Sequence, residues 1–159
     1  MVVKGLLEPV LGEKVNLVNA PILLKERQVE LVTTTTSHSR GYTGLISVRV
    51  RSGDQEGAAD GTVFQHDEVR LVRLNTYRLE AELEGINLII QNLDKPGVIG
   101  VIGTTLGKYQ VNIANMHLSR TPDKDRAIAI IRIDDEAPVE ALDDLLNHPN
   151  IISVQQVRL

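Results

Sequence analysis

The 159-residue sequence contains no cysteine, no tryptophan and only one phenylalanine. The lack of cysteine excludes disulfides and cysteine nucleophiles, and it is typical of a reducing compartment. Because aromatic residues make up only 3% of the sequence, the core must be aliphatic. No apolar run approaches the roughly 20 residues of a membrane-spanning helix, and the start, MVVKGLL, lacks the features of a signal peptide. We expect a cytoplasmic protein with no membrane partner.

An excess of basic residues is also missing. The sequence has 17 Lys and Arg against 21 Asp and Glu, a formal net charge of −4. This charge argues against nucleic acid as the main partner. The balance of 42% hydrophobic and 24% charged residues is that of a folded protein. The length allows one ordinary domain or two small ones.

Catalytic and metal-binding patterns are not found either. The histidines lie far apart, without the spacing of metal ligands. The sequence has no G-x-S-x-G motif and no P-loop, and the glycines after residue 96 do not form a G-x-G-x-x-G fingerprint. We expect no catalytic site, no metal site and no bound cofactor in this chain. The histidines are His38, His66, His117 and His148.

The first half of the sequence predicts two helices and an antiparallel sheet. Helical spacing of apolar residues covers residues 5–28, where Gly12 is a plausible end of the first helix and Asn19 a plausible cap of the second. Alternating residues 29–39 predict a strand that ends in a run of hydroxyl side chains. Asn75-Thr76 predicts a hairpin. Further strands are predicted at residues 45–51, 57–64, 69–74 and 77–83, with a turn at 65–68.

Arginines are concentrated in this first half of the chain. Because they lie in or beside predicted strands, some of them must share a face of the sheet. A guanidinium binds both oxygens of a carboxylate or phosphate, so we predict a possible anion site at Arg70, Arg73 and Arg78. Equally supported is a solvated sheet face on which nearby acidic residues balance the arginines. The other arginines of this group are Arg40, Arg49 and Arg51.

The second half predicts the order β-α-β-β-α-β, which is typical of a ferredoxin-like sandwich. The nearly continuous apolar run at residues 126–134 predicts a central strand. In the second helix, Leu142, Leu145 and Leu146 are expected on one face. We therefore predict an α+β protein, in which a small helix-plus-antiparallel-sheet domain at residues 1–85 precedes a ferredoxin-like βαββαβ domain at residues 86–159.

A polar elbow, residues 92–97, joins the first strand of this second domain to its first helix. Pro96 fixes its own φ, and Gly97 can adopt angles that let a ligand approach the backbone. The first helix amides, from Val98 onward, have no acceptors within the helix and carry the positive end of its dipole, which favours a carboxylate. Asp94 can take a cation. A carboxylate site beside an acidic side chain suits a free α-amino acid.

Glycines recur within this helix at spacings of three and four residues, at Gly100, Gly103 and Gly107. They therefore share one helix face. Each lowers helix stability by about 1 kcal/mol relative to alanine. We expect a close approach by the sheet or by a partner to compensate for this loss.

The run DKPGVIGVIGTTLGKYQVNIANM resembles the signature of an ACT domain, a ligand-binding module attached to many enzymes of amino-acid metabolism. Upstream, KGLLEPVLGEKVNLVNAPILLKERQVE and RGYTGLISVRV are similar to the intervening domain of the longer bacterial D-3-phosphoglycerate dehydrogenases. The two resemblances cover nearly the whole chain in that family's order. They imply a ferredoxin-like second domain and a regulatory region without catalytic residues. NAD is implied only for a full-length enzyme.

The resemblance also implies residue roles. In this family the ACT domain binds L-serine between two ACT domains, so a homo-oligomer, at least a dimer, is implied. Asn92 and Asp94 match positions that hold the effector's polar groups, and Asn112 matches an asparagine that faces them from the partner. The amides near Gly97 and Val98 would take the carboxylate. From the residues alone, Asn92 and Asp94 could simply order a turn, and Asn112 could end one.

Two other functions are open at this point. The chain could resemble the β subunit of an iron–sulfur L-serine dehydratase, which has a similar pair of domains. It could also be a free-standing ACT dimerisation module. The run VNLVNAP and the lack of a serine-rich signature favour the dehydrogenase over the dehydratase. Ligand binding would distinguish both from a dimerisation module.

Overall fold

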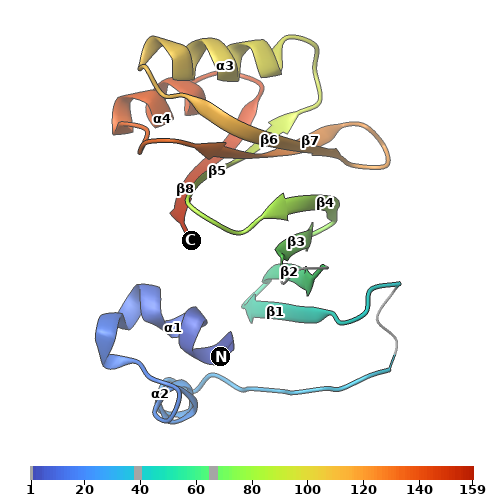
Figure 1. The fold of residues 1–159 in the computed structure, drawn as a ribbon, viewed down its shortest axis with the longest axis vertical. Coiled ribbons are helices and arrows are strands. Elements are labelled where there is room, and N and C mark those ends of the chain that lie inside the picture. The colour runs from blue at the N-terminus through green and yellow to red at the C-terminus, as the bar shows by residue number, and fades with distance from the viewer. Residues whose placement is uncertain (1, 38–40, 65–67) are drawn as a thin grey trace. The chain divides into compact units, whose positions relative to one another are not determined.

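The computed structural model describes residues 2–37, 41–64 and 68–159 (Figure 1). Its contacts divide the chain into two units, residues 1–39 and 40–159. The division into domains at residues 1–85 and 86–159 stays a prediction. None of the helices in the described ranges is long and apolar enough to cross a membrane. Three residues named above, His38, Arg40 and His66, lie outside the described residues, as do residues 65–67 of the turn predicted at 65–68.

The first unit contains the two predicted helices, α1 (Val2–Leu11) and α2 (Ala20–Glu26), with a short 3-10 turn, η1 (Gly12–Lys14), between them. Gly12 ends α1 as predicted, with a φ of 66° that a residue with a side chain rarely adopts. A small apolar cluster holds the pair together. Its buried members are Leu7, Val15, Ala20 and Leu24.

Asn19 occupies the N-cap position of α2, but its side chain does not cap the helix. The Asn19 Oδ1 instead accepts the backbone N–H of Asn16 at 2.8 Å, and Nδ2 donates to the backbone oxygen of Lys14 at 2.8 Å. Asn19 was therefore predicted at the correct end of α2, but the predicted capping role is wrong, because its side chain stabilises the preceding turn.

The strand predicted at residues 29–39 is wrong over its described part, residues 29–37, where the structure has no strand. A strand requires a neighbouring strand to accept and donate its backbone hydrogen bonds. The alternation also fails to separate a buried face from an exposed one, because Val29, Leu31 and Val32 are all exposed.

The described residues of the second unit, 41–64 and 68–159, form two four-stranded antiparallel sheets. The first follows the chain, with a register shift at Asp60 and Gly61. Asn75, with a φ of 53°, forms the predicted hairpin, and its Oδ1 accepts the Ala58 N–H at 2.9 Å. The strands of this sheet, in order, are β1 (Ile46–Ser52), β2 (Gln55–Val63), β3 (Val69–Leu74) and β4 (Tyr77–Glu82).

The second sheet has the order β6-β7-β5-β8, and both of its helices cover one face (Figure 1). This confirms the predicted ferredoxin-like βαββαβ arrangement and the α+β class. The strand β7 lies between β5 and β6, as its apolar sequence predicted. The elements are β5 (Ile86–Leu93), α3 (Val98–Lys108), β6 (Ile113–Arg120), β7 (Arg126–Ile133), α4 (Val139–Leu146) and β8 (Ile151–Arg158).

The face that α4 buries includes two of the three predicted leucines. Ala141 and Leu145, one helical turn apart, are fully buried and Leu142 is partly buried. Leu146 is exposed. The stripe at positions i and i+4 faces the sheet, with Leu142 at its edge, and Leu146 is rotated out of it.

The glycines of α3 also lie elsewhere than expected. The buried stripe of α3 is Val98, Ile102 and Leu106, one residue in every four. A Cβ atom added at Gly100, Gly103 or Gly107 would meet nothing within 4 Å. The expected close approach by the sheet is therefore wrong, since the sheet packs against a different face of α3. A close approach by a partner stays a prediction.

We expect Gly103→Ala to stabilise the protein by about 0.4–1 kcal/mol, because alanine restricts the unfolded chain and has open space in the helix. Gly97→Ala, at the start of the same helix, should instead destabilise it by about 1–2 kcal/mol, since φ is 92° there. Urea unfolding of both variants checks the pair. A loss of stability in Gly103→Ala would show that the helix face is in contact with something absent from a single chain.

Candidate effector site

The elbow is an ordered turn tied to two neighbouring loops. The Leu93 N–H donates to the Asn150 oxygen at 2.8 Å, and the Asp94 N–H donates to the Asp125 oxygen at 3.0 Å. Gly97 then occupies the N-cap position of α3 in the left-handed region. These contacts fix the direction in which the first amides of α3 point.

Asn92 is buried at this elbow, with 2% of its surface exposed. Its Nδ2 donates to the Leu93 backbone oxygen at 2.7 Å. Its Oδ1 is buried and has no hydrogen-bond partner among the described residues. An unsatisfied buried acceptor destabilises a fold by about 1–3 kcal/mol. A ligand that brings a donor, such as an ammonium group, would remove that penalty.

Asp94 forms an ion pair with the Nε of Arg120, from the end of β6. The carboxylate is mostly buried and the guanidinium is mostly exposed. A cationic ligand group would therefore share Asp94 with Arg120 or displace it. The contact of Arg120 with the elbow was not predicted from the sequence. The strand order would have shown it, because Arg120 and Asn92 both pair with Ala127.

The start of α3 supplies further donors. The first turn contains no acidic side chain that would neutralise the dipole. The Val98 N–H has only a long hydrogen bond, 3.4 Å to the Lys95 oxygen. The amides of Gly97 and Val98 therefore remain candidates for binding a carboxylate, next to the fixed ring of Pro96.

Asn112 does not meet the elbow within one chain. It directly precedes β6, whose first residue, Ile113, pairs with Ile133, and Ile133 also pairs with Ile86 at the start of β5. About 20 Å of strand separates this end of the sheet from the elbow. The Asn112 Nδ2 donates to the Asp134 Oδ2 at 2.7 Å. A site that uses both asparagines needs two copies of the chain.

The three arginines of the predicted anion site lie on β3 and β4. Arg70 pairs with Glu68 at 2.7 Å and Glu82 at 2.9 Å, and its hydrogen bond to Glu68 is the main cause of its raised pKa. An incoming anion would have to displace these carboxylates.

Arg73 and Arg78 face each other in the β3–β4 register. Arg73 binds both oxygens of Asp60, at 2.6 and 2.8 Å, and this hydrogen bonding raises the pKa of Arg73. In the described parts of the chain, Arg78 makes no ion pair. The anion site stays a prediction.

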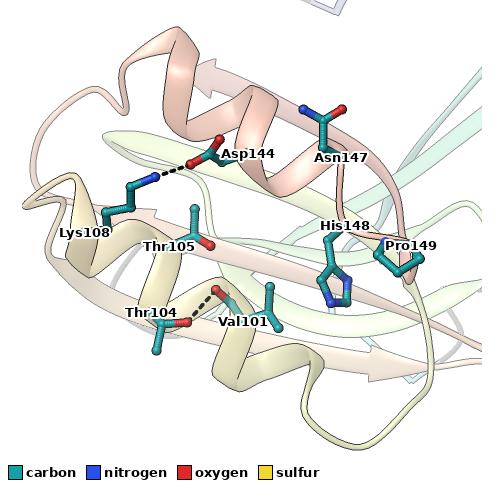
Figure 2. A pocket seen from close by; sticks show the side chains of 8 residues that line it. All are labelled: Val101, Thr104, Thr105, Lys108, Asp144, Asn147, His148 and Pro149. Atoms are coloured by element: carbon teal, nitrogen blue, oxygen red, sulfur yellow. Dashed lines mark hydrogen bonds and ion pairs between the residues drawn. The ribbon is translucent and has the colours of Figure 1, made fainter.

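A groove of about 450 Å³ lies between α3 and α4 (Figure 2). Lys108 Nζ lies 2.6 Å from Asp144 Oδ2, and the Tyr109 hydroxyl donates to the same oxygen at 2.8 Å. The hydrogen bond from Lys108 lowers the pKa of Asp144, and the hydrogen bond to Asp144 raises the pKa of Lys108. Lys108 and Asp144 already bind each other, so a charged ligand in the groove would have to displace one of them. Its lining residues are Val101, Thr104, Thr105, Lys108, Asp144, Asn147, His148 and Pro149.

No group of three or more His, Asp or Glu side chains within residues 2–37, 41–64 and 68–159 is arranged as metal ligands would be. The elbow, with its unsatisfied acceptor, its paired carboxylate and its helix amides, is therefore the best-supported candidate site. The groove is not part of it.

Comparison with known proteins covers both halves of the chain. Residues 1–75 match the family model of the D-3-phosphoglycerate dehydrogenase intervening domain, and residues 86–149 match that of the ACT domain. The chain thus has the domain pair of a regulatory region. It matches the C-terminal regulatory region of D-3-phosphoglycerate dehydrogenases.

Relatives named D-3-phosphoglycerate dehydrogenase align over almost all of the chain. The protein from Methanocaldococcus jannaschii is 32% identical over 98% of this chain and 29% of its own length. The proteins from Archaeoglobus fulgidus and Bacillus subtilis are 33% and 32% identical, each over 98% of this chain and 30% of their own length. The chain therefore spans less than a third of these relatives.

Proposed function

We propose that this chain is an amino-acid sensor, the regulatory region of a D-3-phosphoglycerate dehydrogenase of serine biosynthesis, and that its ligand is L-serine. The observation that carries the proposal is the buried, unpartnered Oδ1 of Asn92 beside Asp94 and the first amides of α3. A zwitterion needs an acceptor for its ammonium group and donors for its carboxylate. The elbow supplies both within one turn of chain.

Each polar group of the ligand then has a partner. Asp94 and the Asn92 Oδ1 take the ammonium group, and the amides near Gly97 and Val98 take the carboxylate. Asn112 of a second copy takes the hydroxyl or the carboxylate. The chain would therefore act as at least a dimer, joined through its ACT domain.

Catalysis and NAD are assigned to other parts of such an enzyme, and this chain's residues take no step in it. We keep the cytoplasm as the expected compartment, since the sequence has no cysteine. An iron–sulfur L-serine dehydratase subunit and a free-standing dimerisation module are the alternatives. The names of the aligned relatives favour the dehydrogenase.

Millimolar L-serine should raise the unfolding temperature of this chain, whereas D-serine and glycine should have less effect. A ligand at 100 times its dissociation constant stabilises the folded state by about 2.7 kcal/mol. Asp94→Ala should abolish the shift, and Asp143→Ala, an exposed carboxylate on α4, should keep it. Differential scanning calorimetry measures both. If no amino acid shifts the unfolding temperature, the dimerisation module is the alternative that remains.

A mixing experiment tests the two-copy site. Asp94→Ala and Asn112→Ala should each lose the L-serine shift when measured alone. When the two variants are mixed and allowed to exchange subunits, each mixed dimer regains one site with both wild-type residues. A response that does not return on mixing would place the whole site within one chain.

A further inference from the structure

The junction between the two sheets of residues 40–159 is a short segment, residues 83–85, that joins β4 to β5. Gly85 in this segment has a φ of 70°, a conformation that suits glycine. Glycine alone would give the backbone of this junction conformational freedom. The contacts around Gly85 restrain this junction.

Arg132, in the central strand β7, reaches across to the other sheet. Its Nη1 donates to the Glu82 Oε2 at 2.8 Å and also to the Glu84 Oε1. The side chains of Arg132 and Glu82 are each 31% exposed, so this pair is partly shielded from water. The second Glu82 oxygen, Oε1, accepts from Arg70 Nη1 of β3 at 2.9 Å. One carboxylate therefore links β3, β4 and β7.

The backbone of the junction is bonded as well. The Gly85 oxygen accepts the Leu159 N–H at 2.9 Å, and the Glu84 oxygen accepts the Nδ2 of the buried Asn87 at 2.9 Å. The Arg132 Cδ lies 3.9 Å from the place where a Cβ on Gly85 would sit. The aliphatic part of Arg132 thus covers the one residue of the junction with exceptional backbone freedom.

We propose that Arg132, with Glu82 and Glu84, is a clasp that fixes the β1–β4 sheet against the ferredoxin-like sheet. An isolated surface ion pair contributes little. Here Arg132 shares its charge between two carboxylates, and it is partly buried together with Glu82, although Glu84 is exposed. The hydrogen bonds are charge-assisted. At its other end, β7 pairs with the elbow, since Ala127 is opposite Asn92. Resting on the proposed function, the clasp is the point at which a ligand at the elbow acts on the other sheet.

The absence of cysteine makes the orientation of the sheets measurable. Spin labels on Ser52→Cys and Asp143→Cys, one exposed site on each side of the junction, give a distance distribution by double electron–electron resonance. We expect a narrow distribution that broadens in Arg132→Gln. Arg126→Gln is the matched control, an exposed arginine on the same strand without an ion pair in the described residues. A distribution that is already broad, or that stays narrow in Arg132→Gln, overturns the proposal.

A second variant protects the test against misfolding. If circular dichroism shows that Arg132→Gln is unfolded, Glu82→Gln with Glu84→Gln removes the same contacts from the other sheet and should broaden the distribution equally. Amide hydrogen exchange of residues 83–87 should become roughly tenfold faster in either variant, as expected for the loss of one charge-assisted hydrogen bond. Unchanged exchange in both variants would also refute the clasp.

The role of the clasp in regulation is read separately. L-serine should change exchange in β3 and β4 of the wild type, and not in Arg132→Gln, while the unfolding shift persists in both. If L-serine shifts the unfolding temperature of neither protein, the proposed function fails. The spin-label distances measured without ligand still test the clasp. If L-serine changes hydrogen exchange in β3 and β4 equally in the wild type and in Arg132→Gln, the clasp does not carry the effect of the ligand to the β1–β4 sheet.

Discussion

Ile102→Ala should destabilise the chain by about 2–5 kcal/mol, the range for removing a large aliphatic side chain from a packed core. Ile102 is 0% exposed and lies at the centre of the buried stripe of α3. It belongs to the one large apolar cluster that joins both helices to the second sheet, so the neighbours have little room to fill the cavity. Urea-induced unfolding, followed by circular dichroism, measures the difference.

Ile99→Ala is the matched control, the same substitution three residues earlier in the same helix. Ile99 is 40% exposed, so its removal should cost less than about 1 kcal/mol. Equal losses at the two positions would mean that α3 is covered on both faces. That outcome would contradict the helix orientation and would point to a partner on the glycine-bearing face.

The elements that the sequence predicted well carry their signal in neighbouring residues. The apolar run of β7 has no polar alternation, so it fits only a strand with neighbours on both sides. Asn75 tolerates a positive φ, and the hairpin forms there. At Pro96 and Gly97 the strand pattern of apolar residues ends and the helix pattern begins. Each of these patterns depends on a few residues that are close in the chain.

The elements that were wrong depend on partners that are distant in the chain. Residues 29–37 alternate like a strand, but alternation does not supply the second strand. Gly100, Gly103 and Gly107 share a helix face, but the pattern does not say which face meets the sheet. Asn19 was placed at the correct helix end, while its side chain took a competing hydrogen bond in the preceding turn.

The same distinction applies to the candidate site. The elbow and its helix amides could be predicted, since they follow from the order of Pro96, Gly97 and Val98. The ion pair between Asp94 and Arg120 could not, because it depends on the register of β6. Nor could the buried, unpaired Oδ1 of Asn92, since burial depends on the packing of all elements around it.

Removing a carboxylate should lower the stability of this chain by an amount that depends on how deeply the carboxylate is buried. Glu56 faces Arg49 and Arg51 at 3.7 and 3.4 Å, with all three side chains largely in water. Asp60, four residues later in the same strand, is 3% exposed, and its partner Arg73 is 19% exposed. In water an ion pair is screened, whereas a buried charge without its partner has no other source of solvation.

Asp60→Ala should therefore destabilise the chain by about 3–5 kcal/mol, because it leaves the Arg73 guanidinium unpaired inside the β2–β3 ladder. Glu56→Ala should change stability by less than about 1 kcal/mol. Urea unfolding of both variants at neutral pH gives the comparison. Replacing both partners, Asp60→Leu with Arg73→Met, should recover much of the loss, since neither charge of this pair is then left buried. If the double variant is as unstable as Asp60→Ala alone, the loss comes from the distorted register at Asp60 and Gly61 and not from the stranded charge.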